Sequence, residues 1–176
     1  MRIAYWFSVL ALAASATVHA QASVALPDGG RVSYAAAGAK TRFEIHAHAG
    51  RPYVLTVGRD ATVPTLAAPT KVEVLGSVKG VAFILADTYA SRPGGLSYCQ
   101  AGEERFLRVI SIIRRPARET LRIKLESCRE TIELATPGMA WEPERASLQL
   151  NWLQGPQAGG GPQTRTIKIN AEGKPE

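Results

Sequence analysis

Apolar and polar residues alternate with a period of two in several short segments of the chain, and turn residues separate these segments. Such alternation places apolar side chains on one face of a β-strand and polar side chains on the other. It predicts strands at residues 42–49, 53–57, 71–74, 121–126, 148–152 and 166–170. Residues 81–86 are apolar at every position, which predicts a strand buried on both faces in the middle of a sheet.

Residues 104–114 fit two patterns. Apolar residues recur at helical spacing between Phe106 and Ile113, with acids before them and arginines after them, as a helix dipole favours. Most of these apolar residues are valine or isoleucine, whose stiff β-branched side chains favour a strand. We expect a strand that turns at residues 116–117 into the strand at 121–126.

These elements together predict an all-β fold, a single-domain antiparallel β-sandwich or small barrel stapled by one disulfide. No long linker, charge block or internal repeat divides the chain. The longest irregular segments are residues 91–102 and the Gly- and Pro-rich stretch 156–163, which we expect to join the last two strands. Trp141 and Trp152 lie in apolar patterns and are expected in the core.

The first twenty residues have the organisation of a secretory signal peptide. A positive start at Arg2 precedes the apolar run 3–16, and the small residues Val18 and Ala20 fit a signal-peptidase site. The run is too short to span a bilayer, and no cysteine follows the cut for a lipid anchor. We therefore expect cleavage after Ala20 and a periplasmic or secreted domain at residues 21–176, with no transmembrane segment.

Cys99 and Cys128 are the only cysteines. In an oxidising compartment, two cysteines most simply form one disulfide. The enclosed loop of 29 positions corresponds to about 3.5 kcal/mol of stabilisation. The predicted hairpin places Cys128 opposite Arg105, within reach of Cys99. The alternative is a reactive thiol paired with His46 or His48.

Positive charge is concentrated in one segment. Without Arg2 the chain has 20 Lys and Arg against 15 Asp and Glu, a net charge of +5. Residues 105–129 carry +6, so the remainder sums to −1. The predicted basic patch consists of Arg114, Arg115, Arg118, Arg122 and Lys124. It suits an acidic protein partner or anionic envelope material, and the alternative is a solvated hairpin whose charges prevent edge pairing. Nucleic acid is not expected, because the compartment is wrong and exposed aromatic residues are not interleaved.

A second candidate binding element is the loop at residues 98–104, which begins Tyr98-Cys99-Gln100. A disulfide at Cys99 would hold this loop rigid, and recognition residues are often carried by loops on a rigid scaffold. Tyr98 and Gln100 are the predicted contact residues. The alternative is an ordinary connection whose cysteine only staples the fold.

One pair of residues has the spacing of metal ligands. His46 and His48 lie on one side of a predicted strand, but a zinc site needs a further ligand, for which Asp60, Asp87 and Glu133 are the candidates. A solvated strand face explains the two histidines equally well. We therefore expect no metal and no cofactor.

Catalytic patterns are incomplete. Ser97 lacks the second glycine of a nucleophile elbow, and Glu103 and Glu104 would face opposite sides of a strand. The glycines at 159–161 precede proline instead of the Lys-Ser/Thr of a phosphate-binding loop.

The sequence therefore favours a non-catalytic periplasmic binding protein that docks or neutralises a partner protein, as inhibitors and immunity proteins do. The alternative is a binder of envelope polyanions or glycans, and the third possibility is a hydrolytic enzyme with a site that these patterns do not reveal. The sequence leaves the oligomeric state open.

Overall fold

The structure is a computed structural model that describes the whole chain except residues 1–21, 48–49, 59, 65–67, 94–101 and 158. The described strands form three antiparallel sheets. The N-terminal sheet contains β1 (Ala22–Ala25), β2 (Arg31–Ala37), β3 (Lys40–His46) and β4 (Tyr53–Gly58). The central sheet contains β5 (Lys71–Val78), β6 (Ala82–Ala90), β7 (Glu103–Ser111) and β8 (Arg118–Ser127). The C-terminal sheet, in the order β11-β10-β9, contains β9 (Glu133–Glu142), β10 (Ser147–Gln154) and β11 (Gln163–Lys168).

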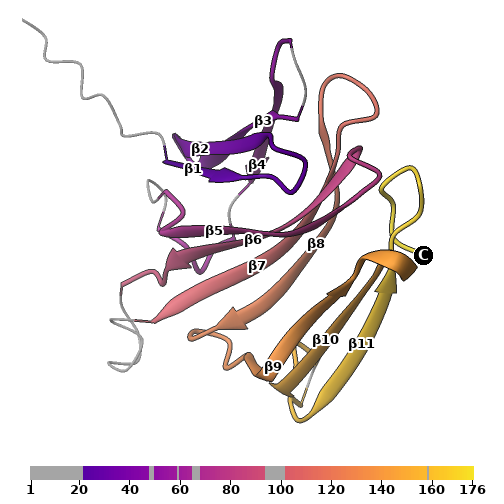
Figure 1. The fold of residues 1–176 in the computed structure, drawn as a ribbon. Helices are drawn as coiled ribbons and strands as arrows, with labels where there is room; N and C mark the ends of the chain where they lie inside the picture. The colour runs from indigo at the N-terminus through magenta and orange to yellow at the C-terminus, as the bar shows by residue number, and fades with distance from the viewer. Residues whose placement is uncertain (1–21, 48–49, 59, 65–67, 94–101, 158) are drawn as a thin grey trace, which may run out of the picture.

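The central sheet lies between the other two sheets (Figure 1). Successive residues of β6 enter different cores, as the alternation of a strand requires. Ala82, Ile84 and Ala86 pack with residues of the C-terminal sheet, whereas Phe83 and Leu85 pack with residues of the N-terminal sheet. The prediction of an all-β antiparallel fold is confirmed, and of the predicted strand at residues 81–86 the part from Ala82 is a strand buried on both faces.

The barrel alternative is wrong, because none of the three sheets closes on itself. The sheets form three layers, since a central sheet that is apolar on both faces needs a cover on each. Three strands, β1, β2 and β9, were not predicted from the sequence. Alternation is weak in the alanine-rich β2, and Pro137 and Gly138 interrupt β9, whose pairing with β10 is irregular near these residues.

Residues 104–111 form a strand, as predicted, but the register of the β7–β8 hairpin differs from the expected one. Ser111 pairs with Arg118, so the turn centres two residues earlier than residues 116–117. Two β-bulges then shift the pairing along the hairpin. As a result Cys128 lies beside Glu103, to which its N–H donates a hydrogen bond of 3.3 Å, and not opposite Arg105.

A buried ion pair lies between the central and N-terminal sheets. Arg108, on β7, has a side chain that is 1% exposed, and its Nε lies 2.8 and 2.9 Å from the two carboxylate oxygens of Asp87 on β6. Its Nη1 donates to Glu119 Oε1 on β8 at 2.5 Å. The ion pair therefore connects three adjacent strands of the central sheet.

A hydroxyl pair extends this network into the N-terminal sheet. Tyr89 Oη donates to Asp87 Oδ2 at 2.7 Å and lies 2.8 Å from Thr41 Oγ1 on β3. Since the tyrosine proton is used on Asp87, Thr41 is the donor of the second bond. Burial and the charge of Asp87 raise the pKa of Tyr89, so its hydroxyl stays protonated. Burial also raises the pKa of Asp87, against the opposing effects of Arg108 and Tyr89.

We predict that Arg108→Met lowers the free energy of unfolding by about 3–5 kcal/mol, because it leaves the Asp87 carboxylate buried without a cation. Urea unfolding measures this change. Asp87→Leu combined with Arg108→Met should recover a large part of the loss, because it removes both buried charges. The matched control is Arg145→Met, since Arg145 pairs with Glu142 on the surface with its side chain 79% exposed. Equal effects of Arg108→Met and Arg145→Met would contradict the role given to the buried pair.

Candidate functional site

The connection between β7 and β8, residues 112–117, projects from one end of the central sheet and is anchored by two apolar side chains. Ile112 and Ala117 are buried in the core that the central sheet shares with the N-terminal sheet. Between and beside them Ile113, Arg114 and Arg118 are exposed, and Ile113 retains 46% of its surface. The buried side chains thus fix the position of the turn. The turn in return exposes two arginines and one apolar residue to solvent.

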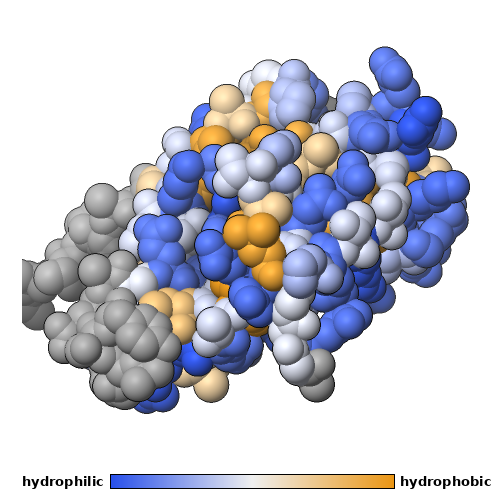
Figure 2. Space-filling view, turned by 90° about the horizontal axis from the view of Figure 1, so that it is seen from below, coloured by the Kyte–Doolittle hydropathy of each residue, from blue (hydrophilic) through white to orange (hydrophobic). Residues whose placement is uncertain are grey.

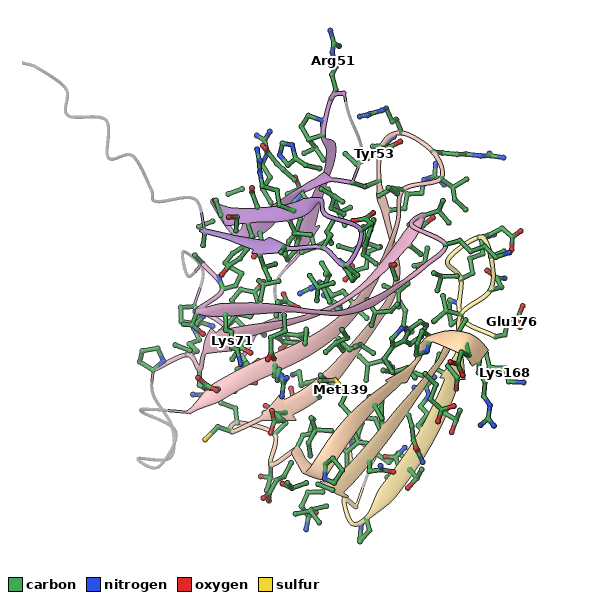
Figure 3. The ribbon with its side chains drawn as sticks, viewed as in Figure 1. Arg51, Tyr53, Lys71, Met139, Lys168 and Glu176 are labelled. Atoms are coloured by element: carbon green, nitrogen blue, oxygen red, sulfur yellow. The ribbon has the colours of Figure 1, made fainter. Side chains whose placement is uncertain are left out.

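Arg115 has a structural role in this turn. Its guanidinium donates to the backbone oxygens of Arg51 and Pro52, the latter at 2.7 Å. It also stacks over the ring of Tyr53 with 4.0 Å between its Cζ and the ring centroid. Figure 3 shows Tyr53 beside this hairpin, below the tip of the β3–β4 connection at Arg51. Arg115, predicted as a binding residue, therefore fastens the hairpin to the N-terminal sheet.

Lys124 is also not part of an exposed patch. Its side chain is 12% exposed, and Nζ lies 3.1 Å from Asp60 Oδ1 and 2.6 Å from Glu130 Oε1. Burial acts to raise the pKa of Asp60, but hydrogen bonds from Thr62 and Lys124 outweigh it and hold the pKa below its ordinary value. The charge of Lys124 is thus neutralised. Arg122 is exposed and donates to the backbone oxygen of Gly58 at 3.3 Å.

Carboxylates from other elements neutralise further charges of the basic segment. Arg105 bridges Glu73 of β5 and Glu126 of β8, and Arg108 has Asp87 and Glu119. Among the described residues, neither Arg114 nor Arg118 has a carboxylate within salt-bridge distance. Within the predicted patch Arg115 and Lys124 are thus held by structural contacts, and Arg122 is exposed and forms no salt bridge with a described residue. Arg114 and Arg118 form an exposed pair at the hairpin turn. A binding role of the patch stays a prediction.

A cavity of about 240 Å³ lies against this pair. It is lined by residues of the β7–β8 hairpin and of the segment that follows β11: Ser111, Ile113, Arg114, Arg118, Thr120, Glu172 and Lys174. Ser111 Oγ donates to the backbone oxygen of Glu172 at 3.1 Å, and Thr120 Oγ1 donates to that of Gly173. Glu172 and Lys174 were not predicted as site residues, because no local pattern in the sequence connects them with residues about 60 positions earlier.

The predicted recognition loop falls largely outside the described residues, which include neither Tyr98, Cys99 and Gln100 nor Ser97. Gly102, which is described, lies against the side chain of Cys128, so that a Cβ at this position would be 2.6 Å from Cys128 Cβ. A chain of three residues from Gly102 can bring Cys99 close to Cys128. The disulfide between Cys99 and Cys128 stays a prediction.

The candidate metal ligands do not come together as a metal site among the described residues. His46 Nε2 lies 3.9 Å from Glu44 Oε2, and His48 is outside the described residues. Asp60 forms a salt bridge with Lys124, and Asp87 forms one with Arg108. In the part of the chain that the structure describes, no three His, Cys, Asp or Glu side chains gather as metal ligands would.

The two adjacent glutamates point to different sides of β7, as expected. Glu103 is exposed, whereas Glu104 is buried and accepts a hydrogen bond of 2.7 Å from Ser91 Oγ. They therefore do not form the facing pair that glycoside hydrolysis uses.

On the face shown in Figure 2 the described residues are mainly hydrophilic, and apolar residues occur in small separate groups. None of the described segments is a helix with the length and apolar character needed to cross a membrane. Comparisons of the chain with protein-family models, with curated proteins and with solved structures found no match. A functional assignment therefore depends on the site itself.

We predict different stability effects for two adjacent arginines. Arg115→Ala should lower the free energy of unfolding by about 1–2 kcal/mol, because it removes two hydrogen bonds from a charged donor and a cation–π contact. Arg114→Ala is the matched control and should change it by less than about 0.5 kcal/mol, as for other exposed residues. Thermal or urea unfolding compares the two variants, and an Arg115→Ala protein as stable as Arg114→Ala would contradict the anchoring role.

Proposed function

We propose that the chain is an exported, non-catalytic binding protein that docks an acidic protein partner through the β7–β8 turn. The observation that carries this proposal is the position of Arg114 and Arg118, which are exposed and form no salt bridge with a described residue, at a turn that the fold anchors. Elsewhere in the same basic segment Arg105, Arg108 and Lys124 form salt bridges with carboxylates. Arg122 is exposed without one, but it lies on β8, away from the cavity. Positive charge that the fold leaves uncompensated at one place can steer an oppositely charged partner.

Anchoring of the turn supports this proposal, because it lowers the conformational entropy that is lost on binding. Ile112 and Ala117 are buried below the turn, and Arg115 attaches it to the connection between β3 and β4. A turn that is ordered before binding loses less conformational entropy on association than a free loop. Tyr98 and Gln100 remain predicted contact residues of a second element.

A binder of envelope polyanions is the alternative, and one observation favours it. Lys174 joins Arg114 and Arg118 around the cavity, and such a group of cations also suits phosphate or sulfate groups. A protein partner is preferred because the exposed Ile113 lines the same cavity and supplies an apolar contact that phosphate and sulfate groups do not use. Glu172 also lowers the attraction of the wall for highly charged anions.

Export and the disulfide complete the proposal, and one measurement tests both. The intact mass of protein recovered from the cell envelope should correspond to a chain that begins at Gln21 and has lost two hydrogen atoms to a Cys99–Cys128 bond. Reduction should restore the hydrogens, and Cys128→Ser should lower the free energy of unfolding by about 2–5 kcal/mol. A mass that includes Met1, or an alkylatable thiol in the native protein, would contradict this part of the proposal.

Partner capture tests the proposed function. The mature protein should recover a stoichiometric acidic protein from periplasmic extract, and Arg114→Glu combined with Arg118→Glu should slow association about 10-fold or more at low ionic strength. The control is Arg145→Glu combined with Lys168→Glu, which makes the same charge change at one end of the C-terminal sheet, where Figure 3 shows Lys168. Surface plasmon resonance measures the rates. Equal slowing by the two double variants would show an effect of net charge alone and would contradict docking at the turn.

A further inference from the structure

We infer that the cavity between the β7–β8 hairpin and the C-terminal segment binds a single carboxylate, that of a glutamate side chain. This inference rests on the proposed function, since the glutamate would belong to the acidic partner. It goes further because it names the group that is bound and adds Lys174, which lies about 60 residues from the arginines in sequence.

The size of the cavity suits one side chain. Its volume of about 240 Å³ lies below the range of about 300–1,000 Å³ that is typical of sites for whole small molecules. Arg114 and Arg118 supply guanidinium groups, which match a carboxylate in shape and can donate two parallel hydrogen bonds to it. Ile113, which is 46% exposed, adds an apolar surface for the methylene groups of a glutamate.

The charged residues that line the cavity make its wall attractive to an anion. Three of them are cationic and one, Glu172, is acidic, so the wall has a net positive charge. Phosphate, with nearly two negative charges, gains more from this attraction than a carboxylate, and Glu172 reduces that gain. The preference for glutamate therefore rests on the apolar contact with Ile113, which a phosphate does not make.

The wall that carries Lys174 is ordered by its own contacts. Asn170 Oδ1 accepts hydrogen bonds from the N–H groups of Glu172 at 3.1 Å and Lys174 at 2.9 Å. Gly173, between them, has a φ of +74° and lies so close to β6 that a Cβ would be 2.6 Å from Ala82 Cβ. A residue other than glycine would be strained here. Asn170 and Gly173 are therefore positioning residues for Lys174.

The test is an NMR titration of the isotopically labelled mature protein with glutamate blocked at both ends. We expect saturable shifts at the amides of Ser111, Thr120 and Lys174, with a Kd in the millimolar range, about 1–10 mM, as suits a single charged contact. Blocked glutamine is the neutral control ligand and should cause no saturable shift. Arg118→Gln should weaken glutamate binding about 10-fold, since hydrogen bonds from a charged donor are involved. Arg145→Gln, at an exposed arginine of another element, should not weaken it.

A second titration, with inorganic phosphate, tests the role of Glu172. Phosphate should bind more weakly than blocked glutamate, because it makes no apolar contact with Ile113. Glu172→Gln should improve phosphate binding more than glutamate binding, because phosphate has the higher charge. The inference is overturned if glutamine causes the same shifts, if Arg118→Gln binds glutamate as the natural protein does, or if phosphate binds more tightly. If glutamate binds as expected but no protein partner is recovered, the inference is supported and the proposed function fails. If partner association depends on Arg114 and Arg118 but glutamate does not bind, the inference alone fails.

Discussion

Burial of the central sheet on both faces is the constraint on which the rest of the structure depends. β6 is buried at every position from Ala82 to Tyr89, so neither of its faces can be exposed to water without a large loss of apolar burial. The N-terminal and C-terminal sheets supply the two covers. Within one of these interfaces Asp87 would be a costly buried charge, and Arg108 from the neighbouring strand offsets this cost. The ion pair is therefore a consequence of double-sided burial.

The same arrangement explains why the β7–β8 turn is held in place. The turn belongs to the central sheet, and each covering layer makes contact with it. Arg115 connects it to the N-terminal sheet near Tyr53, and Ser111 and Thr120, on the flanking strands, hold the segment that follows the C-terminal sheet. The cavity beside Arg114 and Arg118 thus has one wall from the central sheet and one from the chain beyond β11.

Short-range alternation was sufficient to predict much of the fold. The strands at residues 53–57, 71–74, 121–126 and 148–152 follow from it, as does the central position of β6. The predictions at residues 42–49 and 166–170 hold in part, since β3 ends at His46 and β11 at Lys168. Its failures have physical causes. β9 contains Pro137 and Gly138, which weaken the strand signal, although pairing with β10 outweighs this local preference. The number of layers was not predicted, because a doubly apolar strand indicates two covers without indicating which segments supply them.

The candidate site was predicted less well, because charge compensation is a long-range property. The excess of positive charge at residues 105–129 is evident in the sequence, but Glu73, Asp87 and Asp60, which neutralise part of it, come from earlier elements. Lys174 joins the site only through the fold of the C-terminal segment. Arg114 and Arg118 are exposed at the turn, as the sequence led us to expect, and their binding role stays a prediction.

The turn of the hairpin presents positive charge without salt bridges, whereas the charges of Arg108 and Lys124 on the strands are paired. Paramagnetic relaxation of amide protons by an anionic and by a cationic cosolute measures the local electrostatic potential residue by residue. We expect a strong preference for the anionic cosolute at residues 113–118 and little preference near Arg108 and Lys124. An equal preference along the whole length of β7 and β8 would contradict this expectation.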